Sequence, residues 1–186
     1  MGLDLNLERL FEVQKKLDDH IIQKKGLKGQ DLLAKKILAL LVELGELANE
    51  WRGFKFWSND QEPRTRHLEP DIEHFDKTRE TRWIESNPLL EEYVDCLHFL
   101  LSIGLESDIG TFSRDELAPS KMDSIEIQFI SLFEAASRFI YDINYYPEMW
   151  ELFLGLGEML GFTWQQVEEA YFQKNAVNHE RQENGY

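Results

Sequence analysis

Two pairs of acidic residues, each spaced three apart within an otherwise apolar stretch, are the part of this sequence best suited to chemistry. Glu43 and Glu46 belong to LVELGELANEW, and Glu92 and Asp95 belong to EEYVDCLHFLLS. Residues three apart lie on one face of a helix. Carboxylates bordered by apolar residues need partners if they are buried. Two helices that each offer two carboxylates suit hard divalent cations such as Mg²⁺, which take oxygen ligands.

A cluster of this kind could act on a phosphate ester. Two or three divalent cations held by the four acids would bridge a triphosphate and orient an attacking water. Glu50 falls on the same helical face as Glu43 and Glu46. The alternative is ordinary, because acids three or four apart commonly mark a solvated helix face. Lys35 and Lys36, one to two turns upstream, could form simple ion pairs with Glu43 or Glu46.

A stripe of cations and amides lies near the C-terminus. Lys174, Asn178 and Arg181 follow one another at i, i+4 and i+7, and Asn175 is adjacent to them. Arg can bind phosphate oxygens in a two-pronged geometry, and Lys binds them as a point charge. The other interpretation is a solvated terminal helix. The polar tail at about 181–186 has too little apolar surface to hold itself down, so we expect it to be mobile.

Aromatic and amide side chains near these motifs are candidates for a nucleobase pocket. Trp57 follows the first acidic helix, and His98 and Phe99 follow Asp95. A flat ring can stack on a base, and the amide of Gln14 can hydrogen-bond its edge. Aromatic residues at helical spacing are more often part of a core. A histidine at such a position is also more often structural than a magnesium ligand.

Helical periodicity dominates the chain, and no run shows the two-residue period of a strand convincingly. Helices are predicted at about 5–24, 31–51, 87–106, 123–145, 147–161 and 164–180. Asn87 before Pro88 is typical of a helix start, and Thr163 with Gln166 matches a capping box. The polar stretch at about 59–86 is predicted to be an insertion or a lid. The sequence therefore predicts a single all-α domain over 1–186, a helical bundle with two central metal-binding helices.

Composition narrows the class of partner. The formal net charge is −15 and the pI is about 4.7, which argues against nucleic acid, whose binding depends on Lys and Arg at phosphates. One cysteine, Cys96, excludes an intrachain disulfide and fits a reducing compartment. The sequence offers neither a secretory signal nor a membrane span. We therefore expect a cytoplasmic protein that binds neither nucleic acid nor membrane.

With these residues in view, the chain resembles the dimeric all-α dUTPases, relatives of the wider all-α NTP pyrophosphatases. Four blocks in the family's order carry the resemblance over most of the chain: FEVQKKLDDHI, LVELGELANEWRGFKFW, EEYVDCLHFLLS and YFQKNAVNHERQENGY. The long polar stretch between Glu46 and Glu92 departs from the compact members, and it bears on the lid and dimer surface more than on the metal site. The resemblance implies substrate-binding roles for Gln14, Asp18, Trp57, His98, Phe99, Lys174, Asn175, Asn178, Arg181 and Tyr186.

The resemblance implies a reaction as well, in which dUTP and water give dUMP and pyrophosphate. Glu43, Glu46, Glu92 and Asp95 would hold two or three Mg²⁺ ions, for which Mn²⁺ could substitute. Glu46 is our choice for the carboxylate that takes the proton of the water, with Glu50 as its support or substitute. A homodimer is also implied, with residues of both subunits able to line each site.

Three other functions compete with this one. A pyrophosphatase for another nucleotide, such as dCTP, would use the same metal site. A carboxylate-bridged di-iron bundle is a second rival, because Asp95 and His98 imitate an acid-x-x-His pair. That architecture wants such a pair on two helices, and Glu43-x-x-Glu46 offers no histidine. The third is a non-enzymatic helical module whose acids are merely solvated.

Overall fold

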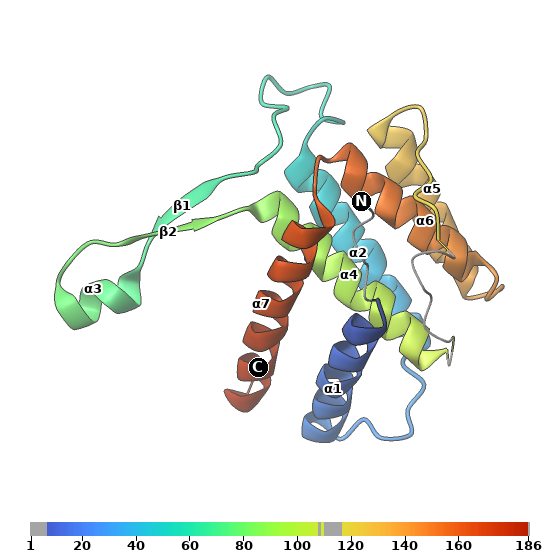
Figure 1. Cartoon of the computed structure of the whole chain (residues 1–186), viewed down its shortest axis with the longest axis horizontal. Helices are drawn as coiled ribbons and strands as arrows, with labels where there is room; N and C mark the ends of the chain where they lie inside the picture. Colours follow the sequence, from blue (N-terminus) through green and yellow to red (C-terminus); the bar gives the residue numbers. More distant parts are fainter. Residues whose placement is uncertain (1–6, 108, 110–116, 186) are drawn as a thin grey trace.

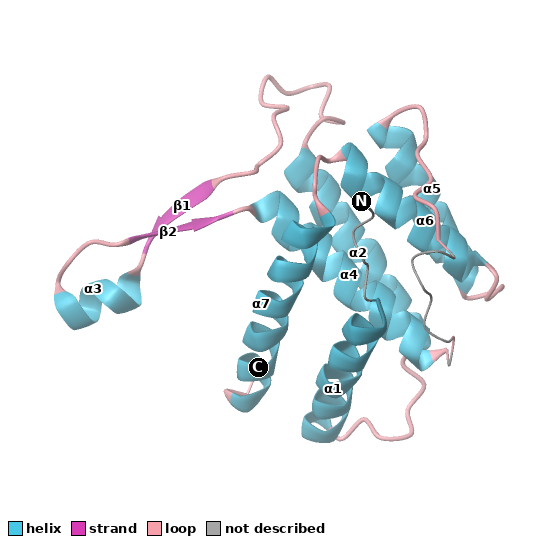
Figure 2. Cartoon of the chain, viewed as in Figure 1, coloured by secondary structure: helices cyan, strands magenta, loops and turns pink. Residues whose placement is uncertain are grey.

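A computed structural model describes residues 7–107, 109 and 117–185, and Figure 1 traces their arrangement. Long helices dominate, as Figure 2 shows. None of the described helices is long and apolar enough to cross a membrane. The helices are α1 (Leu7–Lys25), α2 (Leu33–Trp51), α3 (Ile72–Thr78), α4 (Pro88–Glu106), α5 (Ile125–Phe139), α6 (Tyr145–Met159) and α7 (Trp164–Glu183).

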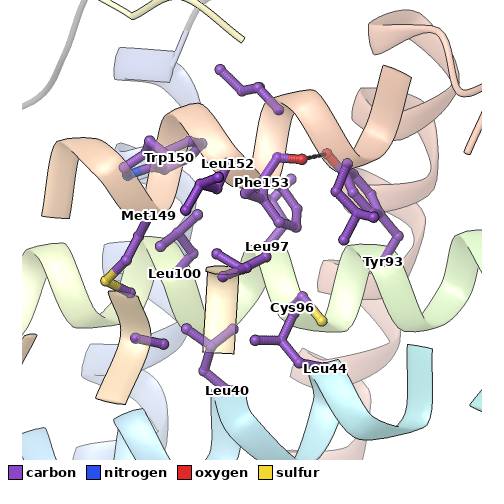
Figure 3. Close-up of a cluster of buried hydrophobic side chains, with 14 of the residues drawn as sticks. Leu40, Leu44, Tyr93, Cys96, Leu97, Leu100, Met149, Trp150, Leu152 and Phe153 are labelled. Carbon is purple, nitrogen blue, oxygen red and sulfur yellow. Dashed lines mark hydrogen bonds between the residues drawn. The ribbon is translucent and has the colours of Figure 1, made fainter. Parts of the chain in front are cut away.

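Helix α4 is the centre of the bundle. It packs against α1, α2, α6 and α7, and α5 packs against both α2 and α6. Fully burying one leucine side chain in such a core stabilises the fold by about 1.5–3 kcal/mol. Such packing makes α2 and α4 a fixed pair. Figure 3 shows the core that joins three helices, with Leu40 and Leu44 of α2, Cys96, Leu97 and Leu100 of α4, and Trp150, Leu152 and Phe153 of α6.

Two predicted helix starts are confirmed. The Asn87 side chain accepts a hydrogen bond from the backbone N–H of Leu90 at 3.1 Å, so it caps α4. Thr163 and Gln166 form the predicted capping box of α7. The predicted helix 123–145 is too long, because α5 ends at Phe139. The Asp142 side chain then accepts hydrogen bonds from the backbone and side chain of Asn144, a local arrangement that competes with helix.

The polar stretch forms an arm that leaves the bundle (Figure 1). Strand β1 (His67–Pro70) pairs antiparallel with β2 (Trp83–Ser86), and α3 connects them at the tip. The amino-acid pattern predicts no strand here, because four residues are too few to establish a two-residue period. Each face of the ribbon mixes apolar and charged side chains, since Leu68 lies opposite Glu85, and Glu69 lies opposite Ile84.

Candidate active site

A cavity of about 490 Å³ opens among α1, α2, α4 and α7. In Figure 1, α1 and α7 lie side by side beneath the α2–α4 pair. Two regions of the lining differ in chemistry. We call the first the acidic end and define it by Glu43 and Asp95, which line the cavity, together with Glu92, whose carboxylate clusters with theirs. We call the second the Asp18 end and define it by Gln14, Asp18, Lys36, His98 and Ser102, which line the cavity, together with Glu106, which accepts from Lys36.

The acidic end brings together three of the four acids that the sequence proposed as metal ligands. Glu43 comes from α2, and Glu92 and Asp95 come from α4. One carboxylate oxygen from each lies within 4.8 Å of the other two, and all three residues are partly buried. The cluster exists because α2 and α4 pack closely, so two acid-bearing helical faces meet across one seam.

The acids of this cluster have too little positive charge around them. Burial, the negative charge of Asp95 and then that of Glu46 raise the pKa of Glu43 to about 7. The same three causes, with Glu43 added, raise the pKa of Glu92 to about 7. Burial also raises the pKa of Asp95, although the ammonium of Lys174 opposes that rise from 2.6 Å away. Carboxylates shifted in this way are typical of sites that take a cation or a proton.

The other two predicted acids lie beside this cluster rather than in it. Glu46 is exposed, one turn along α2 from Glu43, and close enough for its charge to raise the pKa of both Glu43 and Glu92. Glu50 is half-buried, and its carboxylate accepts a hydrogen bond from Arg64 at 3.1 Å. Glu50 therefore has a cation partner from the stretch that leads into the arm.

At the Asp18 end, Gln14 is a buried hub. Its amide oxygen lies 3.0 Å from the Tyr171 hydroxyl, which donates to it, and 2.8 Å from Nδ1 of His98. Because an amide oxygen only accepts, His98 must carry its proton on Nδ1. Burial, and then the charge of Lys174, lower the pKa of His98 to about 3, so the ring is neutral. Its Nε2 is a buried acceptor with no partner among the described residues.

Asp18 is held by side chains from three helices. Gln14 of α1 donates its amide N–H at 2.8 Å, Ser102 of α4 donates its hydroxyl, and Lys36 of α2 lies 3.3 Å away. Lys36 also donates to Glu106 at 2.7 Å. The simple ion pair of Lys36 with Glu43 or Glu46 that the sequence allowed is therefore wrong, because Lys36 turns toward α1 and the end of α4.

The cation stripe of α7 closes the cavity on another side. Lys174, Asn178 and Arg181 all contribute to the lining, together with Phe99 of α4. Helix α7 continues to Glu183, so Arg181 is helical and part of the segment expected to be a mobile tail is helix. Asn175 is instead buried, with 6% of its surface exposed. Tyr186 lies outside the described residues.

Trp57 is the predicted pocket residue that the structure keeps away from the cavity. It is 66% exposed and makes edge contacts with Phe54 and Phe56. Conversely, Lys36 and Ser102 line the cavity although neither was predicted as a site residue. A signal for Ser102 existed, since it continues the helical stripe of Asp95 and Phe99. Nothing in the sequence indicated that Lys36 faces α1, because that depends on how the helices are arranged.

This architecture is an all-α bundle in which two helices bring carboxylates, and a third brings cations, to one cavity. The family model described as dUTPase matches residues 6–79 and 74–186, and the two matched stretches meet within the arm. The chain therefore belongs to the all-α dUTPase family. Membership assigns it to the nucleoside triphosphate pyrophosphatases, enzymes with a small-molecule nucleotide substrate. No curated protein matches the chain significantly.

Proposed function

We propose that this protein hydrolyses dUTP to dUMP and pyrophosphate in an Mg²⁺-dependent reaction. The observation that supports the proposal most strongly is the convergence of Glu43, Glu92 and Asp95 at one end of a nucleotide-sized cavity. Helix α7 contributes Lys174 and Arg181 to the lining of the same cavity, and Lys174 lies 2.6 Å from Asp95. An anionic triphosphate needs both, because cations bound at the acidic end and the side chains of α7 can together neutralise its charge.

The donor set at the acidic end fits magnesium. Its ligands are carboxylate oxygens, which hard divalent cations prefer, and the raised pKa values of Glu43 and Glu92 indicate uncompensated negative charge. Glu43, Glu92 and Asp95 would hold two or three ions, with Glu46 as the fourth ligand. Bound Mg²⁺, or Mn²⁺ in its place, would supply charge neutralisation and a lower pKa for the attacking water.

The residues of the chain would share the remaining work. Glu46, exposed beside the cluster, is our candidate for the carboxylate that takes the proton of the water. Glu50, held by Arg64, would support the helix turn that carries Glu46. Lys174 pairs with Asp95 at 2.6 Å, and it would pass to a phosphate oxygen when cations occupy the acidic end.

The Asp18 end would bind the nucleoside. Phe99, which also lines the cavity, offers a flat apolar face, and His98 is neutral with an Nε2 acceptor that has no partner among the described residues. A uracil ring presents one N–H donor between two acceptors, so a pocket that offers both hydrogen-bond donors and acceptors suits it. The di-iron alternative is less well supported, because Nδ1 of His98 is engaged by Gln14 and only carboxylates meet at the cluster.

We further propose a homodimer in the cytoplasm. The dimer follows from the family resemblance, and the location from the single buried thiol of Cys96. Light scattering coupled to gel filtration measures the assembly directly. A fully active monomer at micromolar concentration would contradict the proposed dimer but not the proposed reaction.

The decisive experiment is a substrate panel. Pyrophosphate release should be measured for dUTP, dCTP, dTTP and the ribonucleotide UTP, each with Mg²⁺, with Mn²⁺ and with EDTA. We expect dUTP to be turned over fastest and EDTA to abolish the reaction. Faster turnover of dCTP would be compatible with the proposed metal site but would show that dUTP is not the preferred substrate. No metal-dependent release from any triphosphate would overturn the proposal in favour of a binding module.

A further inference from the structure

Lys36 lies at a position where its ammonium group has no capacity left for a ligand. Its side chain is 13% exposed, and its Nζ contacts Glu106 at 2.7 Å, Asp18 at 3.3 Å and the carbonyl oxygen of Ser102 at 3.4 Å. A lysine has three donors, and these three acceptors use all of them. Lys36 lines the cavity but is not available as a phosphate clamp.

Asp18, by contrast, keeps an acceptor site open as far as the described part of the chain is concerned. Its carboxylate receives hydrogen bonds from Gln14, Ser102 and Lys36, whereas an ionised carboxylate has about four lone-pair sites. Asp18 also lines the cavity, with 12% of its side chain exposed. The unused site therefore belongs to a carboxylate whose orientation is fixed by donors from three different helices.

Glu106 ties this arrangement to the backbone. One carboxylate oxygen accepts from Lys36, and the other accepts from the backbone N–H of Leu32 at 3.3 Å, just before α2. Leu32 provides no side-chain cap for α2, and two acids accept from the backbone there instead, Asp31 from Leu33 at 3.0 Å and Glu106 from Leu32. Glu106 thus fixes the position of the Lys36 ammonium, and the ammonium in turn contacts Asp18 on the cavity wall.

Stability alone does not account for these charges. Replacing a buried ion pair with apolar residues is often neutral or stabilising, because desolvation offsets the attraction. Here two carboxylates share one ammonium on the wall of the nucleotide cavity, where an apolar wall would cost the fold little. The arrangement makes sense if an ionised acceptor must face the ligand at a fixed position.

We propose that Lys36, anchored by Glu106, is a positioning residue that holds Asp18 as an acceptor for one hydrogen-bond donor of the bound nucleotide. The inference rests on the proposed function and adds a specificity requirement to it. A deoxyuridine nucleotide has two such donors away from its phosphates, the N3–H of the base and the 3′-hydroxyl of the sugar. Lys36 touches neither, and acts through Asp18.

The test compares Lys36→Met, Lys36→Arg and the control Lys16→Met, which removes an exposed lysine of α1. Each is assayed with dUTP, N3-methyl-dUTP and 2′,3′-dideoxyuridine triphosphate. We expect Lys36→Met to raise KM for dUTP by roughly ten- to hundredfold, the range for a hydrogen bond to a charged group, with a much smaller change in kcat. Lys36→Arg should recover much of the loss, and Lys16→Met should match the wild type.

The analogues identify the donor. The penalty of Lys36→Met should disappear for the analogue that lacks the group bound by Asp18, and persist for the other. A penalty equal for all three nucleotides would overturn the proposal, because a merely structural lysine would affect them alike. If Lys36→Met does not fold, Asp18→Asn gives the same comparison, since it keeps the shape and removes one acceptor.

Failure of this inference is distinguishable from failure of the proposed function. Wild-type protein that turns over dUTP, with no analogue-dependent penalty in the variants, refutes the role of Lys36 alone. Wild-type protein that hydrolyses another triphosphate is tested with the N-methyl and 3′-deoxy analogues of that substrate. Wild-type protein that binds no nucleotide, measured by calorimetry with Mg²⁺, refutes both.

Discussion

The acidic end and the Asp18 end of the cavity each gather carboxylates from different helices, but their neutralising partners differ. At the acidic end, Glu43, Glu92 and Asp95 have the ammonium of Lys174 as their close cation partner among the described residues. At the other end, donors from three helices surround Asp18. The first arrangement has a deficit of positive charge that an external cation can fill. The second has its own cation and presents a fixed acceptor.

This difference teaches how to distinguish two kinds of buried acid. A buried carboxylate with few cationic partners has a raised pKa, as Glu43 and Glu92 do. When it is ionised it lowers the stability of the fold, unless a cation binds to it. A carboxylate surrounded by hydrogen-bond donors, as Asp18 is, has a fixed orientation that needs no bound cation. The first kind should respond strongly to metal and pH, and the second to substrate structure.

The largest expected effect is loss of turnover at the acidic end. Glu92→Gln should lower kcat/KM for dUTP by at least about a hundredfold, because it removes a ligand oxygen while keeping the shape of the side chain. The matched control is Glu91→Gln, the exposed neighbour on the outer face of α4. It should retain activity within about twofold. Equal activity of both variants would remove Glu92 from the metal site.

The next effect concerns the cations of α7. Arg181→Ala should raise KM for dUTP by roughly ten- to hundredfold, since it removes a charge-assisted contact to phosphate. Turnover should fall too if the contact positions the phosphate under attack. Arg138→Ala is the control, an exposed arginine of α5 that pairs with Glu134. If Arg181→Ala binds and turns over dUTP like the control, α7 is not a phosphate clamp.

The two ends should also respond oppositely to the loss of a charge. In EDTA at pH 8, Glu43→Gln should raise the melting temperature, because it relieves burial and repulsion of an ionised carboxylate. Asp18→Asn should lower it, because it replaces an acceptor with a donor opposite Lys36 and Ser102. Each kcal/mol corresponds to about 2–4 °C for a chain of this size. Shifts of the same sign would contradict the distinction between the ends.

How far the sequence could go is clear from these residues. The spacing of Glu43 and Glu46, and of Glu92 and Asp95, predicted helical faces, and the caps at Asn87 and Thr163 predicted where two helices begin. Helical spacing also predicted that Lys174 and Arg181 would share a side of α7. These features are local, because 3.6 residues per turn fixes them within one helix.

What the sequence could not give depends on packing between helices. Lys36 and Asp18 are 18 residues apart, and the packing of α1 and α2 against α4 brings the ammonium of Lys36 to the carboxylate of Asp18. The exposure of Trp57 similarly depends on where the chain leaves α2 and enters the arm. The two-stranded ribbon in the arm could not be predicted either, because its strands are only four residues long.

The smallest and most diagnostic effect is the pH dependence of the metal-free protein. Glu43 and Glu92 have a pKa near 7 in the folded protein against an ordinary value of 4.5. The folded state therefore binds protons more tightly than the unfolded chain. Their contribution to stability is fully present below about pH 4.5 and is lost as the pH rises through 7.

His98 opposes this trend and must be removed from the comparison. Its pKa falls to about 3 in the fold, so its burial costs stability at low pH and ceases to do so above its ordinary value of 6.5. The informative quantity is therefore the melting temperature of the Glu43→Gln/Glu92→Gln double variant minus that of the wild type, in EDTA. His98 contributes equally to both proteins and cancels. The difference should be near zero at pH 4, grow as the pH rises from about 4.5 to 7 and level off by pH 8. Saturating Mg²⁺ should abolish or reverse it at pH 8, because only the wild type gains a bound cation there. A difference that stays constant from pH 5 to pH 8 would mean that the two carboxylates ionise as easily in the fold as in water, and the acidic end would then be no different from a solvated helix face.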